Sequence, residues 1–250
     1  MKLTKKVSIL TAALMMFGIL TACGKTEDNA EKKTLTMATN AEFPPYEFRD
    51  GDKIVGIDAE IAQAIADELG MELVIEDMAF DSIIAAVQSG KADIGVAGMT
   101  VDETRLKSVN FSTPYTTAAQ VIIVKDNSAI AVPDDLTGKT IGVQLGTTGD
   151  IYAGDIKEAK IDRYNKGYEA VQALMQDKVE AVIIDREPAK VFIEQNSGLK
   201  ILDEDFTVED YAIAINKDNE KLLNDVNGAL KKLKDSGKLQ EIIDKYITAE

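Results

Sequence analysis

The segment from Phe80 to Arg105 carries residue types that could hold a carboxylate. Its last part places two small residues, a hydroxyl and a guanidinium close together, and it includes Gly98, Thr100 and Arg105. A planar guanidinium beside backbone N–H groups can bind a carboxylate through two parallel hydrogen bonds. The preceding residues predict a helix, a turn at Gly90 and a short buried strand, and parallel sheets bind ligands in the loops after their strands. The segment therefore predicts a carboxylate-binding loop at a strand end.

A second segment, residues 167–185, repeats this helix–turn–strand pattern. Asp93 before the first strand corresponds to Glu180 before the second, with one residue lost at the turn. In this alignment Gly98 lies opposite Asp185, so one strand end offers amide donors and the other offers a carboxylate. Two similar lobes that face each other would bind a molecule with both an anionic and a cationic group.

The composition excludes several classes of function. The 250-residue chain has no histidine and one cysteine, Cys23, which excludes Ser-His-Asp triads, Cys-His pairs, His-ligated metals, internal disulfides and Cys-rich zinc sites. Catalysis would depend on Asp, Glu, Lys, Tyr or Ser alone, so we expect a protein that is not an enzyme and that has no metal or cofactor. The formal net charge of −15 argues against nucleic acid as a partner, because phosphate binding needs clustered Lys and Arg.

The first 33 residues predict export and attachment to a membrane. Residues 1–22 begin with lysines and continue with the apolar run VSILTAALMMFGIL, which predicts a signal peptide, with a short transmembrane anchor as the alternative. Leu-Thr-Ala-Cys, ending at Cys23, resembles the lipobox of bacterial lipoproteins, in which the cysteine is lipidated by fatty acids such as palmitate. Residues 23–33 are therefore expected to be the lipidated cysteine and a flexible, polar tether.

The rest of the chain predicts two α/β lobes. The chain is expected to cross between them near residues 116–120 and again near 209–213, and two amphipathic helices joined near 236–237 would return to the first lobe. Residues 40–53 are expected to be a loop, and the acids of the next helix, Asp58 among them, are expected to face solvent. The predicted boundaries are 34–118 and 212–250 for lobe 1, and 119–211 for lobe 2.

From about residue 35 to residue 247, the chain resembles the polar amino-acid-binding proteins that deliver substrates to ATP-driven importers, the bacterial extracellular solute-binding proteins of family 3. The resemblance implies an α/β, two-lobed periplasmic-binding-protein fold of type II, with a two-stranded hinge, that closes on a free amino acid. It is carried, in this order, by TNAEFPPYEF, GIDAEIAQAIA, FDSIIAAVQSGKADI, AGMTVDETRLKSVNFSTPY, GVQLGTTGD and AVIID.

The resemblance also implies roles for residues at matching positions. Arg105 would pair with the ligand α-carboxylate, and Thr148 would contact the same carboxylate from the second lobe. Asp185 would accept the α-ammonium group. Further polar contacts would come from Ala97, Gly98, Thr100 and Thr147.

The ligand side chain is less well defined by the resemblance. Phe43 and Phe80 would sandwich it. Relatives that bind basic amino acids can carry an acid at position 40, whereas this chain has Asn40, with Glu42 close by. The class of ligand therefore stays open between neutral polar and basic amino acids.

Together these observations predict a monomeric, lipid-anchored, extracytoplasmic receptor. It would bind a polar amino acid and deliver it to the permease and ATPase of an ABC importer. The alternative is a periplasmic dehydratase-like enzyme on the same fold, for which Glu42 is the acid or base that the sequence offers. A ligand-sensing module for signalling is a third interpretation, which no residue supports.

Overall fold

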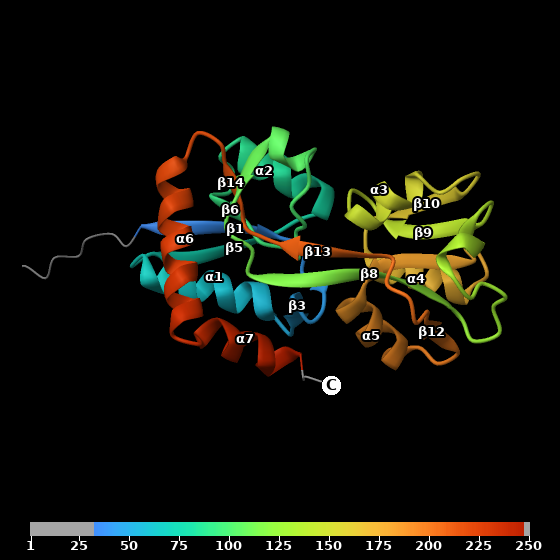
Figure 1. Ribbon diagram of the computed structural model, residues 1–250. Helices are drawn as coiled ribbons and strands as arrows, with labels where there is room; N and C mark the ends of the chain where they lie inside the picture. Colours follow the sequence, from blue (N-terminus) through green and yellow to red (C-terminus); the bar gives the residue numbers. More distant parts are fainter. Residues whose placement is uncertain (1–32, 248–250) are drawn as a thin grey trace, which may run out of the picture. The chain divides into compact units, whose positions relative to one another are not determined.

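The computed structural model describes residues 33–247, which form two mixed β-sheets, one small antiparallel sheet and the helices that cover them (Figure 1). No helix within these residues is long and apolar enough to cross a membrane. The predicted signal peptide and the predicted lipidation site at Cys23 lie outside the described residues.

The first sheet is built mainly from the N-terminal part of the chain. Its strands β5, β1 and β6 are parallel, with β5 at the edge, whereas β14 runs antiparallel to both β6 and β7. The strand order and bounds are β5 (Glu72–Asp77), β1 (Thr34–Thr39), β6 (Ile94–Gly95), β14 (Ala214–Asn216) and β7 (Val109–Phe111).

Helices cover both faces of this sheet (Figure 1). One face packs against α1 (Ile57–Glu68), α6 (Glu220–Asp235) and α7 (Lys238–Tyr246), with Leu35 and Met37 in the same core cluster as Ile61. The other face packs against a 3₁₀ turn (Phe80–Ser82) and α2 (Ile83–Gln88). The parallel strands β1 and β6 are therefore buried on both sides, as an α/β fold requires, whereas β5 is partly exposed.

The second sheet has the same layered construction. Residues of β8 alternate between its faces: Val121 and Ile123 belong to the core cluster under α4 and α5, whereas Ile122 and Val124 belong to the cluster under α3. The strand order and bounds are β10 (Lys160–Tyr164), β9 (Thr140–Gln144), β11 (Ala181–Asp185), β8 (Thr116–Lys125) and β12 (Leu199–Ile201), with β13 (Thr207–Tyr211) also paired to β8. Its helices are α3 (Thr148–Gly154), α4 (Gly167–Met175) and α5 (Arg186–Gln195), and a 3₁₀ turn spans Pro133–Leu136.

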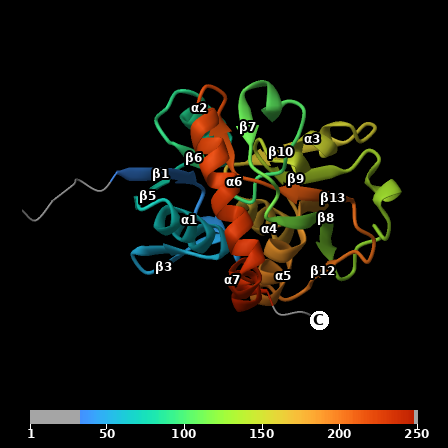
Figure 2. The ribbon, with the colours of Figure 1, turned by 60° about the vertical axis from the view of Figure 1, so that its left-hand side comes forward.

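Two strands connect the sheets. β8 and β13 run antiparallel to each other, with Thr116 opposite Tyr211 and Gln120 opposite Thr207, and Figure 1 shows them side by side between the two sheets. The structure thus places strands at both predicted crossings. The chain returns through β14 to α6 and α7, which lie beside α1 (Figures 1 and 2). The helix break falls at Gly237, whose positive φ of 78° suits glycine. The residue boundaries of the two lobes stay a prediction.

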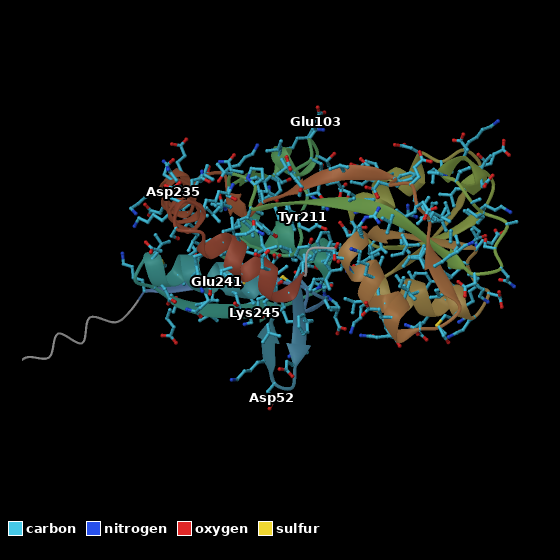
Figure 3. All side chains as sticks on the ribbon, turned by 60° about the horizontal axis from the view of Figure 1, so that its bottom comes forward. Asp52, Glu103, Tyr211, Asp235, Glu241 and Lys245 are labelled. Atoms are coloured by element: carbon cyan, nitrogen blue, oxygen red, sulfur yellow. The ribbon has the colours of Figure 1, made fainter. Side chains whose placement is uncertain are left out.

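The prediction that residues 40–53 form a loop is wrong. Residues 40–53 hold most of a three-stranded antiparallel sheet of β2 (Glu42–Phe43), β3 (Glu47–Asp50) and β4 (Lys53–Val55), and α1 begins after it at Ile57. Asp52 lies at the tip of the β3–β4 hairpin (Figure 3). The two prolines and mixed polarity of this segment conceal its strand pattern, although Asp50-Gly51 is a hairpin turn signal.

Candidate ligand-binding cavity

A small, largely enclosed cavity lies between the strand ends of the two sheets. Its polar walls are almost fully buried; Arg105 is 8% exposed and Asp185 is 5% exposed. All ten residues predicted for a binding site line this cavity, and two unpredicted residues, Glu47 and Gln144, line it as well. The predicted ten are Asn40, Phe43, Phe80, Ala97, Gly98, Thr100, Arg105, Thr147, Thr148 and Asp185.

Arg105 is held in place by the protein itself. Its Nη1 donates to the carbonyl oxygen of Thr100 at 2.7 Å, and its Nε forms an ion pair with Asp102 Oδ2 at 3.1 Å. The guanidinium carbon lies 5.3 Å from the ring centre of Phe80, a cation–π contact. Burial lowers the pKa of Arg105, and Asp102 and other acids oppose this effect. A buried, oriented guanidinium of this kind can bind a carboxylate strongly.

The loop after β6 differs from the expectation in one respect. The backbone N–H of Gly98 donates to Asp58 Oδ2 at 2.7 Å, so this amide is engaged within the protein. The same oxygen accepts a hydrogen bond from the hydroxyl of Tyr115 at 2.9 Å. Asp58 is fully buried, and its predicted place on a solvent-facing helix surface is wrong. Gly98 has φ of 51°, and a Cβ there would lie 3.1 Å from the ring of Phe43, so glycine is required.

Asp185 ends β11 and is buried beside the crossing strand. The hydroxyl of Tyr211 on β13 donates to Asp185 Oδ1, and Tyr211 lies in the interior near the middle of the molecule in Figure 3. Burial raises the pKa of Asp185 to about 7, and the hydrogen bond from Tyr211 only partly opposes this effect. Burial deprives the ionised carboxylate of water. A cation that enters the cavity would replace that lost stabilisation and so favour the ionised form.

The hydroxyl groups of both sheets meet at one carboxylate. Glu209 Oε2 on β13 accepts hydrogen bonds from Thr100 Oγ1 and Thr148 Oγ1, each at 2.9 Å, and from Gln120 Nε2 at 3.1 Å. Thr147 instead caps α3, because its Oγ1 accepts from the N–H of Asp150 at 3.3 Å. Glu209 therefore fixes the positions of two predicted site residues without itself lining the cavity.

Polar contacts also join the two sheets across the cavity. Gln144 Nε2 donates to Asn40 Oδ1 at 3.0 Å, and Arg105 Nη2 donates to the carbonyl oxygen of Gly146 at 3.1 Å. At the rim, Lys166 Nζ lies 2.6 Å from Glu42 Oε1. Glu42, the acid considered for an enzyme, is thus ion-paired at the rim and does not line the cavity.

Sequence reasoning missed Glu47 and Gln144. Glu47 is 1% exposed and begins β3, in the segment that was expected to be a loop. Gln144 is the last residue of β9, and a position at the carboxyl end of a parallel strand is a signal that could have identified it. Within residues 33–247, no group of three or more acidic or thiol side chains is arranged to hold a metal ion.

Known proteins share both the sequence and the fold of this chain. Residues 35–249 match the family model of the bacterial extracellular solute-binding proteins, family 3. The arginine-binding extracellular protein ArtP of Bacillus subtilis (strain 168) is 37% identical over 98% of this chain and 99% of its own length.

Two solved structures extend this similarity to the fold. An ancestral arginine-binding protein bound to arginine superposes with a TM-score of 0.82 and 42% identity, over 86% of this chain and 99% of that one. The ancestral amino acid-binding protein AncCDT-1, a precursor of cyclohexadienyl dehydratase, superposes with a TM-score of 0.79 and 35% identity, over 85% of this chain and 95% of that one. The predicted two-lobed periplasmic-binding-protein fold of type II is confirmed.

Proposed function

Because the chain belongs to the bacterial extracellular solute-binding proteins, family 3, we propose that it binds one free polar amino acid in the enclosed cavity and delivers it to the permease and ATPase of an ABC importer. One observation carries this proposal: a buried guanidinium, Arg105, and a buried carboxyl group, Asp185, line the same cavity. An amino acid has a complementary pair of charged groups attached to one carbon atom, and charge-assisted hydrogen bonds are stronger than neutral ones.

Each site residue has a role in this proposal. Arg105 binds the α-carboxylate, which Thr148, beside Thr147, contacts from the opposite wall. Asp185 accepts the α-ammonium group. Phe43 and Phe80 enclose the ligand side chain, and Ala97, Gly98, Thr100 and Asn40 complete the walls. The chain acts as a binding protein and needs no cofactor.

Closure of two lobes around the ligand follows from the arrangement of the crossing strands. We assign residues 34–118 and 212–250 to lobe 1 and residues 119–211 to lobe 2, joined by β8 and β13. Rotation about two paired strands can open a cleft between lobes without disturbing either core. The contact of Arg105 with Gly146 supports a closed arrangement in this structure, because it joins residues assigned to different lobes.

The chain is proposed to act as a monomer at the outer face of the cell membrane. Residues 1–22 would direct export, Cys23 would carry the lipid, and residues 23–33 would form the tether. Diacylation at Cys23 would give stable anchoring, since each buried CH₂ contributes about 0.8 kcal/mol.

A thermal-shift screen of the purified chain against the standard amino acids tests the proposal. A ligand present at 100 times its dissociation constant should stabilise the fold by about 2.7 kcal/mol. A raised melting temperature with one chemical group of amino acids is the expected result. A folded chain whose melting temperature no amino acid raises would overturn the proposal.

The enzyme alternative has one supporting observation, the similarity to a dehydratase precursor. The position of Glu42 weighs against it, since this acid pairs with Lys166 outside the cavity lining. Incubation with cyclohexadienyl acids such as prephenate, followed by product detection, separates the two functions. We expect no turnover.

A further inference from the structure

Glu47 is a buried acid in the cavity wall that the proposed function does not use. It is 1% exposed and lines the cavity with Arg105 and Asp185. Within the described part of the chain, no N–H or hydroxyl donor reaches either of its carboxyl oxygens. A buried carboxyl group without donors is costly, so its persistence in a ligand cavity needs an explanation.

The groups that face Glu47 are mostly acidic. Three acids raise the pKa of Glu47 by repelling its ionised form; Asp58 of α1 has the largest effect, followed by Asp185 of β11 and Asp77 of β5. The hydroxyl groups of Tyr46 and Tyr115 lie nearby. Burial first, and Asp58 second, hold the pKa of Glu47 well above its usual range.

Glu47 and Asp58 are neighbouring buried carboxyl groups, and a single proton between them would relieve their mutual repulsion. Asp58 Oδ2 receives hydrogen bonds from Gly98 and Tyr115, which favour its ionised form, whereas Asp58 Oδ1 receives none from an N–H or hydroxyl group of the described residues. Glu47, whose two carboxyl oxygens receive no such donor, is therefore the member of the pair suited to carry the proton and to donate it to Asp58.

Asn40, the position expected to distinguish ligands, is already engaged. Its Nδ2 donates to the carbonyl oxygen of Met78 at 2.9 Å, and its Oδ1 accepts from Gln144 at 3.0 Å. Glu47 stands directly opposite Phe43 in the β2–β3 pair, so both side chains lie on the same face. An aliphatic chain that packs on the Phe43 ring would bring its end group to Glu47.

We propose that the cavity selects an amino acid with a cationic side chain, whose charged end pairs with Glu47 and displaces the proton that Glu47 gives to Asp58. This inference rests on the proposed function. Once Arg105 and Asp185 have paired with the α-groups, Glu47 is the cavity-lining carboxyl group left for a further positive charge. The O–H bond of Glu47 breaks, its proton leaves to solvent, and the guanidinium or ammonium group keeps all of its own protons.

Matched ligand pairs test this directly. Citrulline has the shape of arginine but replaces the charged guanidinium by a neutral urea, and norleucine has the four-carbon side chain of lysine without its terminal ammonium group. Calorimetric titration at pH 6 in two buffers of different ionisation enthalpy measures both affinity and protons released. We expect arginine or lysine to bind at least ten-fold more tightly than its neutral partner, with up to one additional proton released.

The pairwise comparison cancels any proton lost from Asp185, because both ligands carry the same α-ammonium group. Equal affinities, or equal proton release, within both pairs would overturn the inference and leave the amino-acid receptor intact. If no amino acid binds the folded chain, the proposed function and the inference both fail.

Two variants complete the test. Glu47→Gln should abolish the preference for the cationic ligand over its neutral partner and the additional proton release. Glu42→Gln removes an acid from the rim and should leave both unchanged. If Glu47→Gln binds arginine with wild-type affinity and wild-type proton release, Glu47 is not the selector. Should that variant not fold, the wild-type ligand pairs decide alone.

Discussion

The two repeated units, α2–β6 and α4–β11, have the same backbone construction and opposite chemistry at their ends. Each helix ends in a residue of positive φ, Gly90 at 74° in one and Asp177 at 58° in the other. The N–H groups of the residues that follow, Lys91 and Lys178, both donate back to the fifth residue before them at 2.9 Å.

The acids before the two strands also match. Asp93 Oδ2 accepts the N–H of Thr36 at 2.8 Å, and Glu180 Oε2 accepts the N–H of Thr140 at 3.0 Å. The units differ after their strands. In the first, a loop runs through Gly98 to Arg105, whereas the second strand ends at Asp185 itself. The comparison teaches that local turn geometry builds the scaffold, while a single residue in each unit, Arg105 in the loop after β6 and Asp185 at the end of β11, decides which charge the cavity receives.

Removing the cationic end of this pair should have the largest effect. Arg105→Ala should weaken amino-acid binding about 30-fold or more, because truncating one member of a buried, hydrogen-bonded charge pair costs about 2–5 kcal/mol. Calorimetry measures the loss. Arg49→Ala, which removes a guanidinium 48% exposed on the β3–β4 hairpin, should stay within about two-fold of the wild type. Native affinity in the Arg105 variant would refute the carboxylate assignment.

Removing the anionic end should have two opposite consequences. Asp185→Asn should weaken binding about ten-fold through loss of the α-ammonium partner, about 1.4 kcal/mol. The same change should stabilise the free chain at pH 8 by on the order of 1–2 kcal/mol, because Asp185 is buried and its pKa is raised to about 7. Urea unfolding without ligand measures this second effect. An unchanged affinity would remove Asp185 from the site.

The raised pKa of Asp185 should also make the stability of the free chain depend on pH. The folded chain holds a proton on Asp185 up to about pH 7, whereas the unfolded chain loses it near pH 4. The unfolded state therefore binds fewer protons in this window, and the free energy of unfolding should fall by on the order of 1 kcal/mol or more between pH 4 and pH 7. Urea titrations across that range should show a shallower slope in Asp185→Asn; identical slopes would contradict this account.

Exchanging residues at the two turns should have the smallest effect. Gly90→Ala places a Cβ in open space but at a positive φ, which should cost about 1 kcal/mol. Asp177→Gly should gain up to about 1 kcal/mol, offset by loss of its exposed ion pair with Lys125. Asp177→Asn removes the ion pair with Lys125 but keeps a side chain at the positive φ, so it measures the contribution of the ion pair alone. If Gly90→Ala has wild-type stability, the positive φ at this turn does not require glycine, and the proposed similarity between the two turns is wrong.

The sequence predicts the scaffold well where the pattern is local. The Gly90 turn, the break at Gly237 and the paired crossings follow from short-range signals in glycines, apolar periodicity and strand composition. All ten predicted site residues line one cavity, although their individual roles stay predictions.

The residues that were missed depend on distant neighbours. Asp58 is the second residue of an amphipathic helix, and its burial depends on Gly98, forty positions away. Glu47 was assigned to a loop because Pro44 and Pro45 mask the short strands on either side of them. The spacing of apolar residues within one helix or strand cannot predict a contact between residues that are far apart in the sequence.

The contacts across the cavity join the two sheets directly, and this affects how affinity is set. Hydrogen bonds such as that between Arg105 and Gly146 stabilise the closed form. The observed dissociation constant is the intrinsic constant divided by the fraction of molecules competent to bind. Changes to the rim pair of Glu42 and Lys166 would therefore rescale the affinity for every ligand by one common factor. Strength of capture and choice of ligand are consequently separate properties of this chain, and each can be altered by mutation while the other is kept.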